Sequence, residues 1–287
     1  MNTAIRDYKH TYLFYFLATA IPWFFWGLAA SISHSKDYPN PGDLSSLLAF
    51  AGLLSPALIA FFLICRNKRL MGDMVQRLAN PSSGKPVYWV LTLLLMPASI
   101  LMAQLVSLTF GHSASQFAFS ESYSFTSGVF PVWFLLIAAP IIEELAWHSY
   151  GTDCLCNRFS LFKASMVFAL FWGVWHMPLS LINDYYHSNL LDTGWVHGVN
   201  FLLSLFPFVI IMNWLYYKTG RSILSATIFH VTAGYFNEIF ATHPDSKVIQ
   251  TGILTLVAII IVAQERQLFF GNLAALPGKQ VPSVGLR

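Results

Sequence analysis

Two adjacent carboxylates and a histidine close a long apolar run in the middle of the chain. The run VFPVWFLLIAAPII leads directly into Glu143 and Glu144, and His148 follows one helical turn later. Ionisable residues inside a membrane span are costly and usually mark a functional site. In a helix, Glu144 and His148 share a face, whereas Glu143 points about 100° away. One carboxylate can therefore face a catalytic cavity while the other pairs with His148.

Two further histidines stand inside apolar segments, His176 in FWGVWHMPLS and His230 in ATIFHVTAGYFNE. Gly234 and Asn237 follow His230 at helical spacing and extend it into a polar stripe. We expect the three segments to enclose a polar, water-containing cavity. A second stripe is expected at His176, Ser180 and Asn183. Several other histidines are assigned to loops outside the site: His34, His112, His187, His197 and His243.

This set of residues favours hydrolysis. A buried carboxylate can act as a general base toward water, and histidines can assist it or stabilise an oxyanion. Glu143, His176 and His230 could equally bind zinc, because two histidines and a carboxylate are a common catalytic ligand set. The chain has no HExxH sequence, in which one helix supplies both histidines. The spacing of the residues does not decide between a metal-free general base and a zinc site. We interpret the flanking tryptophans as packing: Trp147, Trp172 and Trp175.

The composition indicates an integral membrane protein. Of 287 residues, 56% are hydrophobic and 10% are charged, whereas soluble domains carry about 25% charged residues. A net charge of +3 is too small to indicate a nucleic-acid partner. The three cysteines form neither a disulfide framework nor a zinc-binding pattern.

Eight apolar segments are long enough to span a membrane, which takes roughly 20 residues. The first lacks a signal-peptide cleavage site and is expected to be retained, and a KTGR turn joins the sixth to the seventh. The segments are 11–32, 44–65, 87–110, 128–148, 161–182, 196–217, 221–241 and 247–264. The sequence therefore predicts an all-α, polytopic membrane protein of about eight transmembrane helices around a polar intramembrane cavity.

The positive charges predict how the chain is oriented. All Lys and Arg residues except Lys36 and Lys247 lie in the terminal segments or in the loops 66–86, 149–163 and 218–221. Basic loops face the cytoplasm, so both termini are predicted to be cytoplasmic. An even number of spans agrees with this. We expect a multi-pass protein of a plasma membrane, specifically a bacterial inner membrane.

The spans are expected to form one domain. It covers residues 1–270, with the site in the region 128–240. The last stretch, 271–287, is rich in Pro and Gly and has no apolar period. We predict a disordered cytoplasmic tail there.

The order of these motifs resembles the CPBP family, the CAAX proteases and bacteriocin-processing or immunity proteins, of which the type II CAAX prenyl endopeptidases are members. The family pattern is Glu-Glu-x-x-x-Arg, then Phe-x-x-x-His, then His-x-x-x-Asn or Asp. The matching stretches here are EELAWH (143–148), FWGVWH (171–176) and HVTAG (230–234). The resemblance covers about 128–240 and the eight-helix layout.

The resemblance implies a role for each residue. Glu143 would activate the attacking water, His176 would assist, and His230 would hold the oxyanion. Glu144 would orient or support the site. The family is described both as metalloproteases and as metal-free glutamate proteases, so no cofactor is required by our leading interpretation and zinc is the alternative. His148 would stand in the place of the family's Arg.

Two positions depart from the pattern, His148 for Arg and Gly234 for Asn or Asp. Arg is permanently charged, whereas His titrates near neutral pH. The loss of one oxyanion donor costs roughly 10²–10³ in rate. Asn237 lies on the same stripe but two turns beyond His230, about 10 Å further along the helix axis, so a direct replacement of the missing donor is not expected.

Our leading hypothesis is an intramembrane endopeptidase of attenuated activity. It would cleave a membrane-embedded or prenylated, CAAX-type peptide, with the bilayer and that peptide as partners. An inactive relative that acts as a membrane binding or bacteriocin-immunity protein is the alternative, and a proton-linked transporter or channel is a third. The oligomeric state is left open.

Overall fold

The computed structural model describes residues 5–78, 84–271 and 273. Within them, eight long helices occupy the places of the eight predicted spans: α1 (Thr11–Ser33), α2 (Pro41–Cys65), α4 (Pro86–Ser107), α5 (Val132–Ala146), α7 (Leu161–His176), α9 (Trp195–Lys218), α10 (Ile223–Ile239) and α11 (Pro244–Gln264). Shorter helices are α3 (Lys68–Leu78), α6 (Thr152–Cys156), α8 (Tyr186–Asp192) and α12 (Arg266–Phe270). The 3₁₀ turns are Ile5–Asp7, Leu108–Phe110, Ala114–Phe117 and Met177–Leu181, and Trp147–Gly151 is a π-helical turn.

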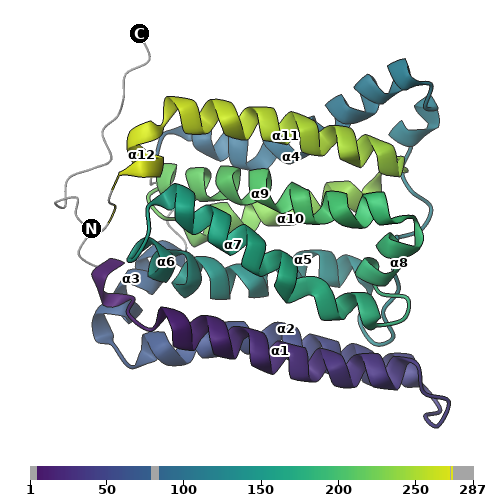
Figure 1. The fold of residues 1–287 in the computed structure, drawn as a ribbon, viewed down its shortest axis with the longest axis horizontal. Coiled ribbons are helices and arrows are strands. Elements are labelled where there is room, and N and C mark those ends of the chain that lie inside the picture. The colour runs from purple at the N-terminus through teal and green to yellow at the C-terminus, as the bar shows by residue number, and fades with distance from the viewer. Residues whose placement is uncertain (1–4, 79–83, 272, 274–287) are drawn as a thin grey trace.

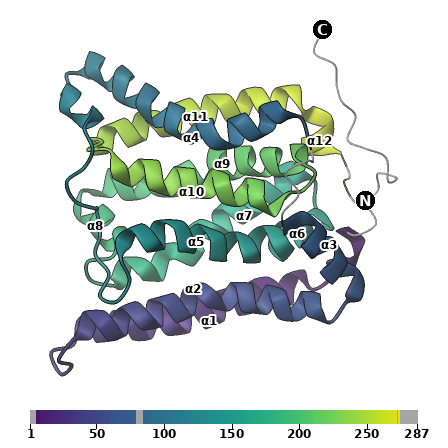
Figure 2. The same cartoon turned by 180° about the vertical axis from the view of Figure 1, so that it is seen from behind.

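The long helices lie roughly side by side in one bundle (Figure 1). α1 and α2 form one side, α4 and α11 form the opposite side, and α5, α7, α9 and α10 fill the middle, as the reverse view also shows (Figure 2). Seven segments of the described chain are long and apolar enough to cross a membrane. The predicted span that is not among them, 221–241, forms α10, which is 17 residues long. The prediction of an all-α, polytopic membrane protein is confirmed.

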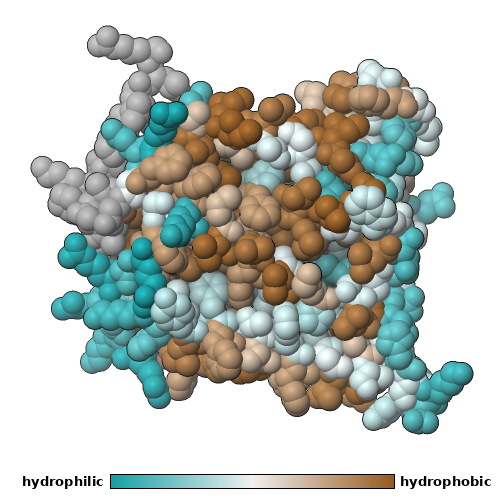
Figure 3. Space-filling view, in the orientation of Figure 1, coloured by the Kyte–Doolittle hydropathy of each residue, from teal (hydrophilic) through white to brown (hydrophobic). Residues whose placement is uncertain are grey.

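On the face shown in Figure 3, apolar side chains cover most of the middle of the bundle, and hydrophilic side chains gather at its two ends. The start of α1 lies at the same end as α3, α6 and α12, whereas α8 lies at the opposite end (Figure 1). The predicted cytoplasmic loops after α6 and α9 also lie at the α3 end. We call this end the basic end. Most of the predicted tail, 274–287, lies outside the described residues, and the single-domain assignment stays a prediction.

The helix that carries His176 ends sooner than its apolar period predicts. α7 stops at His176, two residues before Pro178, and the chain continues as a 3₁₀ turn. Pro178 has no backbone N–H, so it cannot donate to the Val174 carbonyl, which accepts the Met177 N–H instead. The second polar stripe was therefore predicted wrongly. Asn183 turns away from the His176 face and donates its Nδ2 hydrogen to the carbonyl of Ser33 at 2.9 Å.

The chain widens into the π-helical turn directly after α5. Such turns are rare and are often found at functional sites. Arg77 of α3 binds this turn: Nη1 donates to the His148 carbonyl at 2.7 Å and Nη2 donates to the Ser149 carbonyl at 2.9 Å. A residue of the basic loop therefore fixes the backbone that carries His148.

Arg77 belongs to a buried group of two cations and two carboxylates. Its Nε lies 2.7 Å from Asp73 Oδ2, and its Nη1 lies 3.3 Å from Asp153 Oδ2. Arg221 pairs with Asp73 at 3.0 Å and also with Asp153. Burial disfavours the charge of Arg77, but Tyr216 and Asp153 together raise its pKa above the ordinary arginine value. The charges balance, so the group is stable only while it is complete.

We expect Arg77→Met to lower the free energy of unfolding by about 3–5 kcal/mol, because it leaves buried carboxylates uncompensated and frees two carbonyls of the π-helical turn. Unfolding in mixed micelles, followed by circular dichroism, measures this. Arg69→Met is the matched control, since Arg69 is exposed on the same helix. Equal stability of the two variants would contradict the prediction.

Candidate active site

Glu143 lies on α5 with one carboxylate oxygen held by two tryptophans. Its Oε2 accepts hydrogen bonds from Nε1 of Trp172 at 2.9 Å and from Nε1 of Trp147 at 3.3 Å. The residue is 8% exposed. Among the described residues, no hydrogen bond to Oε1 is found. The two indoles therefore orient the carboxylate and leave its second oxygen available to a ligand.

Trp172 contacts both site histidines as well as Glu143. Its ring centroid lies 5.4 Å from that of His176 and 5.2 Å from that of His230. Because it stands four residues before His176, one helical turn places both side chains on the same face of α7. Trp172 also occupies the position at which the family pattern has Phe, and it adds an N–H donor there.

The interpretation of the flanking tryptophans as packing was wrong for two of the three. Trp147 and Trp172 donate to Glu143, as described above. Trp175 does pack: it donates Nε1 to the Ala18 carbonyl at 2.8 Å, away from the carboxylate. The i, i+4 spacing of Glu143 and Trp147 was the one signal in the sequence for the first of these contacts.

The tautomer of His176 follows from its partner. Nδ1 lies 2.7 Å from the carbonyl oxygen of Trp172, and a carbonyl only accepts hydrogen bonds. Nδ1 therefore carries the proton, and Nε2 of the neutral ring carries a lone pair. His176 can accept a proton or orient a water through Nε2.

Glu144 is fully buried and bridges two histidines. Its Oε2 pairs with Nδ1 of His148, and its Oε1 lies 2.8 Å from Nδ1 of His230. The first contact is the i, i+4 pair that the helical spacing predicts. The second joins α5 to α10 and turns Nε2 of His230 away from Glu144. Glu144 thus supports a positive charge on either ring.

A chain of hydrogen bonds behind His148 indicates its protonation state. Ser165 donates Oγ–H to the Leu161 carbonyl at 2.8 Å, so its oxygen accepts from Asn213 Nδ2 at 2.9 Å. The amide oxygen of Asn213 then faces Nε2 of His148 at 3.0 Å. Both ring nitrogens of His148 therefore donate, one to Asn213 and one to Glu144. In this state the ring is a cation, which is the charge that the family's Arg would supply.

We expect His148→Gln to slow peptide hydrolysis, because a neutral amide cannot supply the cation that pairs with Glu144. His148→Arg should keep most of the rate, since Arg carries a permanent charge. Initial rates of the two variants and of the wild type, measured at one pH, test this. A His148→Gln protein as fast as the wild type would contradict the assignment.

Glu143, His176 and His230 line one cavity of about 300 Å³. Its walls come from α5, α7 and α10, the three segments expected from the sequence, and also from α8, α9 and α11. The predicted supporting residues Gly234 and Asn237 line it too. The cavity is therefore wider than the sequence indicates, and it extends from the carboxylate toward the end of the bundle opposite the basic end.

The two stripe residues beyond His230 contribute no donor to the reacting centre. Asn237 donates its Nδ2 hydrogen to the Ala233 carbonyl at 2.9 Å, so that amide group bonds within α10. A Cβ atom added at Gly234 would meet no heavy atom within 4 Å. The position of the family's Asn or Asp is open space on the cavity wall.

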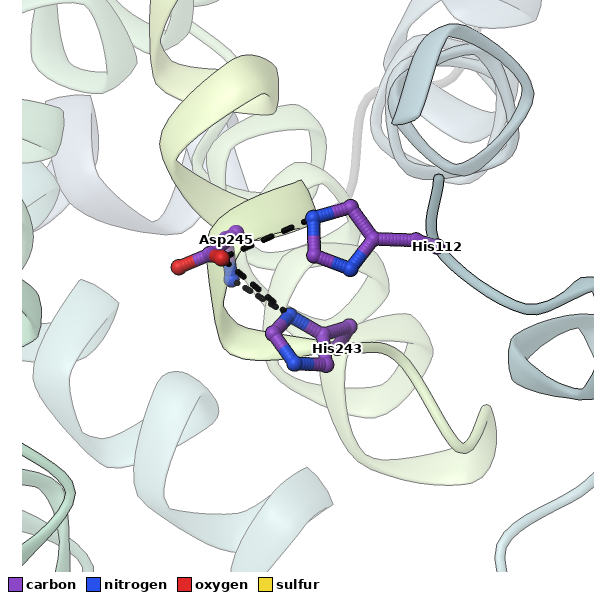
Figure 4. A group of neighbouring side chains, drawn as sticks. All are labelled: His112, His243 and Asp245. Atoms are coloured by element: carbon purple, nitrogen blue, oxygen red, sulfur yellow. Dashed lines mark hydrogen bonds and ion pairs between the residues drawn. The ribbon is translucent and has the colours of Figure 1, made fainter. Parts of the chain in front are cut away.

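The expected zinc ligands do not form a compact metal site. Among the described residues, the group whose ligand atoms all lie within 4.8 Å of one another is His112, His243 and Asp245 (Figure 4), not Glu143, His176 and His230. The outer group is partly exposed, and Nδ1 of His243 accepts the Asp245 backbone N–H that begins α11 at 3.2 Å.

Two further histidines of the cavity, His187 and His197, were assigned to loops outside the site. His187 lies on α8 and stacks on His176, with ring centroids 5.0 Å apart. Neither of its ring nitrogens has a hydrogen-bond partner among the described residues. Burial lowers the pKa of His187, and the neighbouring His176 adds to this effect. No periodicity could have found it, because α8 is a short helix in a connecting segment.

Comparison with known proteins decides the family. Residues 125–236 match the family model described as type II CAAX prenyl endopeptidase Rce1-like. The chain is also 38% identical over 272 residues to CAAX prenyl protease 2 of Methanococcus maripaludis, an alignment that covers 94% of this chain and 99% of that protein. The chain belongs to the family of type II CAAX prenyl endopeptidases. The resemblance inferred from the motifs is confirmed, and with it the assignment as a protease.

The alignment with the Methanococcus protein covers nearly the whole chain. The family model covers residues 125–236, which is close to the region 128–240 that the motifs outlined. The chain therefore shares the family's site region while differing from its pattern at His148 and Gly234.

Proposed function

We propose that this protein hydrolyses a peptide bond of a membrane-associated, prenylated CAAX-type substrate, with Glu143 as the general base. The orientation of Glu143 carries the proposal: one oxygen is fixed by two indoles, and the residue faces a cavity that also contains His176 and His230. An apolar bundle with a polar cavity suits a substrate that is itself held in the bilayer.

The first chemical step is water activation. Oε1 of Glu143 takes a proton from a water, whose oxygen attacks the substrate carbonyl carbon. Nε2 of His176 accepts a second hydrogen bond from that water and orients it. The C–N bond then breaks, and Glu143 returns the proton to the leaving amine. Atoms and charges balance without a further reactant.

His230 is placed to stabilise the oxyanion. Its Nδ1 donates to Glu144, so a proton on Nε2 makes the ring a cation that the buried carboxylate stabilises. An Nε2–H directed into the cavity can then bind the negative oxygen. Glu144 and His148 act through this ring and not on the substrate, so we assign them as positioning residues.

No metal or other cofactor enters this scheme. The support is the spread of the three residues, since the ligand atoms of Glu143, His176 and His230 do not all lie within 4.8 Å of one another. The family's alternative zinc mechanism makes the opposite expectation, which a chelator tests.

The proposal is tested with purified protein in nanodiscs and a quenched-fluorescent, prenylated CAAX peptide. We expect hydrolysis that a metal chelator does not reduce, and much slower hydrolysis of the unprenylated peptide. Inhibition by the chelator that zinc reverses would overturn the metal-free mechanism. Binding of the peptide without any hydrolysis would favour a binding or immunity role instead.

The distribution of charge further supports a plasma-membrane protein whose basic end, and hence both termini, face the cytoplasm. Cys65 reports on this directly: it ends α2 at the basic end and is exposed, whereas Cys154 and Cys156 are buried. A membrane-impermeant maleimide should label inside-out vesicles and not right-side-out vesicles. The reverse result would invert the topology. The same experiment establishes from which side of the membrane the cavity opens.

A further inference from the structure

One lysine lines the cavity, and the chemistry above does not use it. Lys247, in the first turn of α11, is the one Lys or Arg among the described residues that line the cavity. It was also one of the two basic residues outside the predicted cytoplasmic segments. A half-buried ammonium group beside a membrane span is costly and is usually retained for a function.

The ammonium group of Lys247 is available to a ligand. Among the described residues, it has no hydrogen bond and no ion pair. Glu238, across the cavity on α10, is close enough to act on it electrostatically. Both oxygens of Glu238 are bonded elsewhere, to the backbone N–H and to the hydroxyl of Ser124, each at 2.9 Å. An anion of the ligand is therefore the partner that Lys247 lacks.

The separation of Lys247 from the reacting centre has the length of a short peptide. Glu238 lies eight residues beyond His230 on α10, which is about 12 Å along the axis. An extended peptide covers roughly 3.3 Å per residue, so three or four residues span this distance. A chain whose scissile bond lies at Glu143 would place a group three or four residues later beside Lys247.

We propose that Lys247 binds the free C-terminal carboxylate of the substrate. The assignment rests on the proposed function and names what the far end of the cavity recognises. Every peptide ends in this carboxylate, whatever its side chains, so a cation at a fixed distance selects a bond about three residues before the chain end. Lys247 is then a specificity-determining residue.

The test compares two prenylated peptides that differ only in a free C-terminal carboxylate or a C-terminal amide. Binding is measured to the Glu143→Gln protein, so that turnover is not needed. Energy transfer from Trp172 and Trp175, which line the cavity, to a dansyl group on the peptide gives the dissociation constants. We expect the free acid to bind roughly tenfold or more tightly, as for a charge-assisted contact.

Adding Lys247→Met should abolish the preference while leaving the affinity for the amide unchanged, which shows that the cavity is intact. Lys247→Arg should keep most of the preference for the free acid. Lys36→Met is the matched control, because Lys36 is exposed in the loop between α1 and α2 at the same end of the bundle.

The outcomes separate this inference from the proposed function. Binding of both peptides with equal affinity, or an unchanged preference in Lys247→Met, would overturn the role of Lys247 alone. Failure of the protein to bind either peptide would overturn the proposed function, and the assignment of Lys247 with it.

Discussion

Glu143→Gln should slow hydrolysis of a prenylated CAAX peptide by roughly 10²–10⁴-fold, the usual contribution of a general base. Gln has the same shape, and its amide oxygen can still accept from the indoles of Trp147 and Trp172. The loss should therefore fall on kcat and not on the affinity for the peptide. Single-turnover rates and equilibrium binding, measured on the same preparation, separate the two.

The control for this variant is Glu121→Gln, which changes an exposed glutamate in the loop between α4 and α5. It should keep the wild-type rate. Glu144→Gln should also be slow, because it breaks the bridge to His148 and His230. A Glu143→Gln protein that hydrolyses the peptide at the wild-type rate would remove Glu143 from the mechanism.

Gly234→Asn should raise the rate by up to roughly 10²–10³-fold, the value of one oxyanion donor. Residue 234 lies one helical turn beyond His230 on the same face of α10, and it lines the cavity. A Cβ added at residue 234 meets no atom of a neighbouring element within 4 Å, so the position accepts a side chain at its Cβ without a clash. The effect should appear in kcat at saturating peptide.

Gly234→Ala separates the effect of the new amide group on the rate from the effect of losing a glycine on helix stability. Ala also stabilises a helix relative to Gly, by about 1 kcal/mol. We expect Ala to raise the unfolding temperature without raising the rate. An Asn variant no faster than the Ala variant would mean that the oxyanion is already fully bound by other groups. In that case the departure at Gly234 would not have attenuated the site.

Much of this architecture can be predicted from local pattern. The length of each apolar segment predicts a membrane span, because a helix within the bilayer must satisfy the hydrogen bonds of its own backbone. The pairing of Glu144 with His148 follows from one turn of a single helix. The prediction of a polar stripe beyond His176 was wrong because the local geometry changes there. The α-helix ends before Pro178, so helical periodicity no longer gives the direction of Asn183.

The sequence by itself determined the fold class, the spans and the three helices that carry the carboxylates and histidines. Only the tertiary structure decided what surrounds them: the indole of Trp172 on Glu143, the guanidinium of Arg77 on the π-helical turn, and Lys247 at the far end of the cavity. These contacts join different helices, and the first two span 29 and 71 positions of the chain. Helical periodicity relates residues only within one element, so contacts between helices depend on how the whole bundle packs.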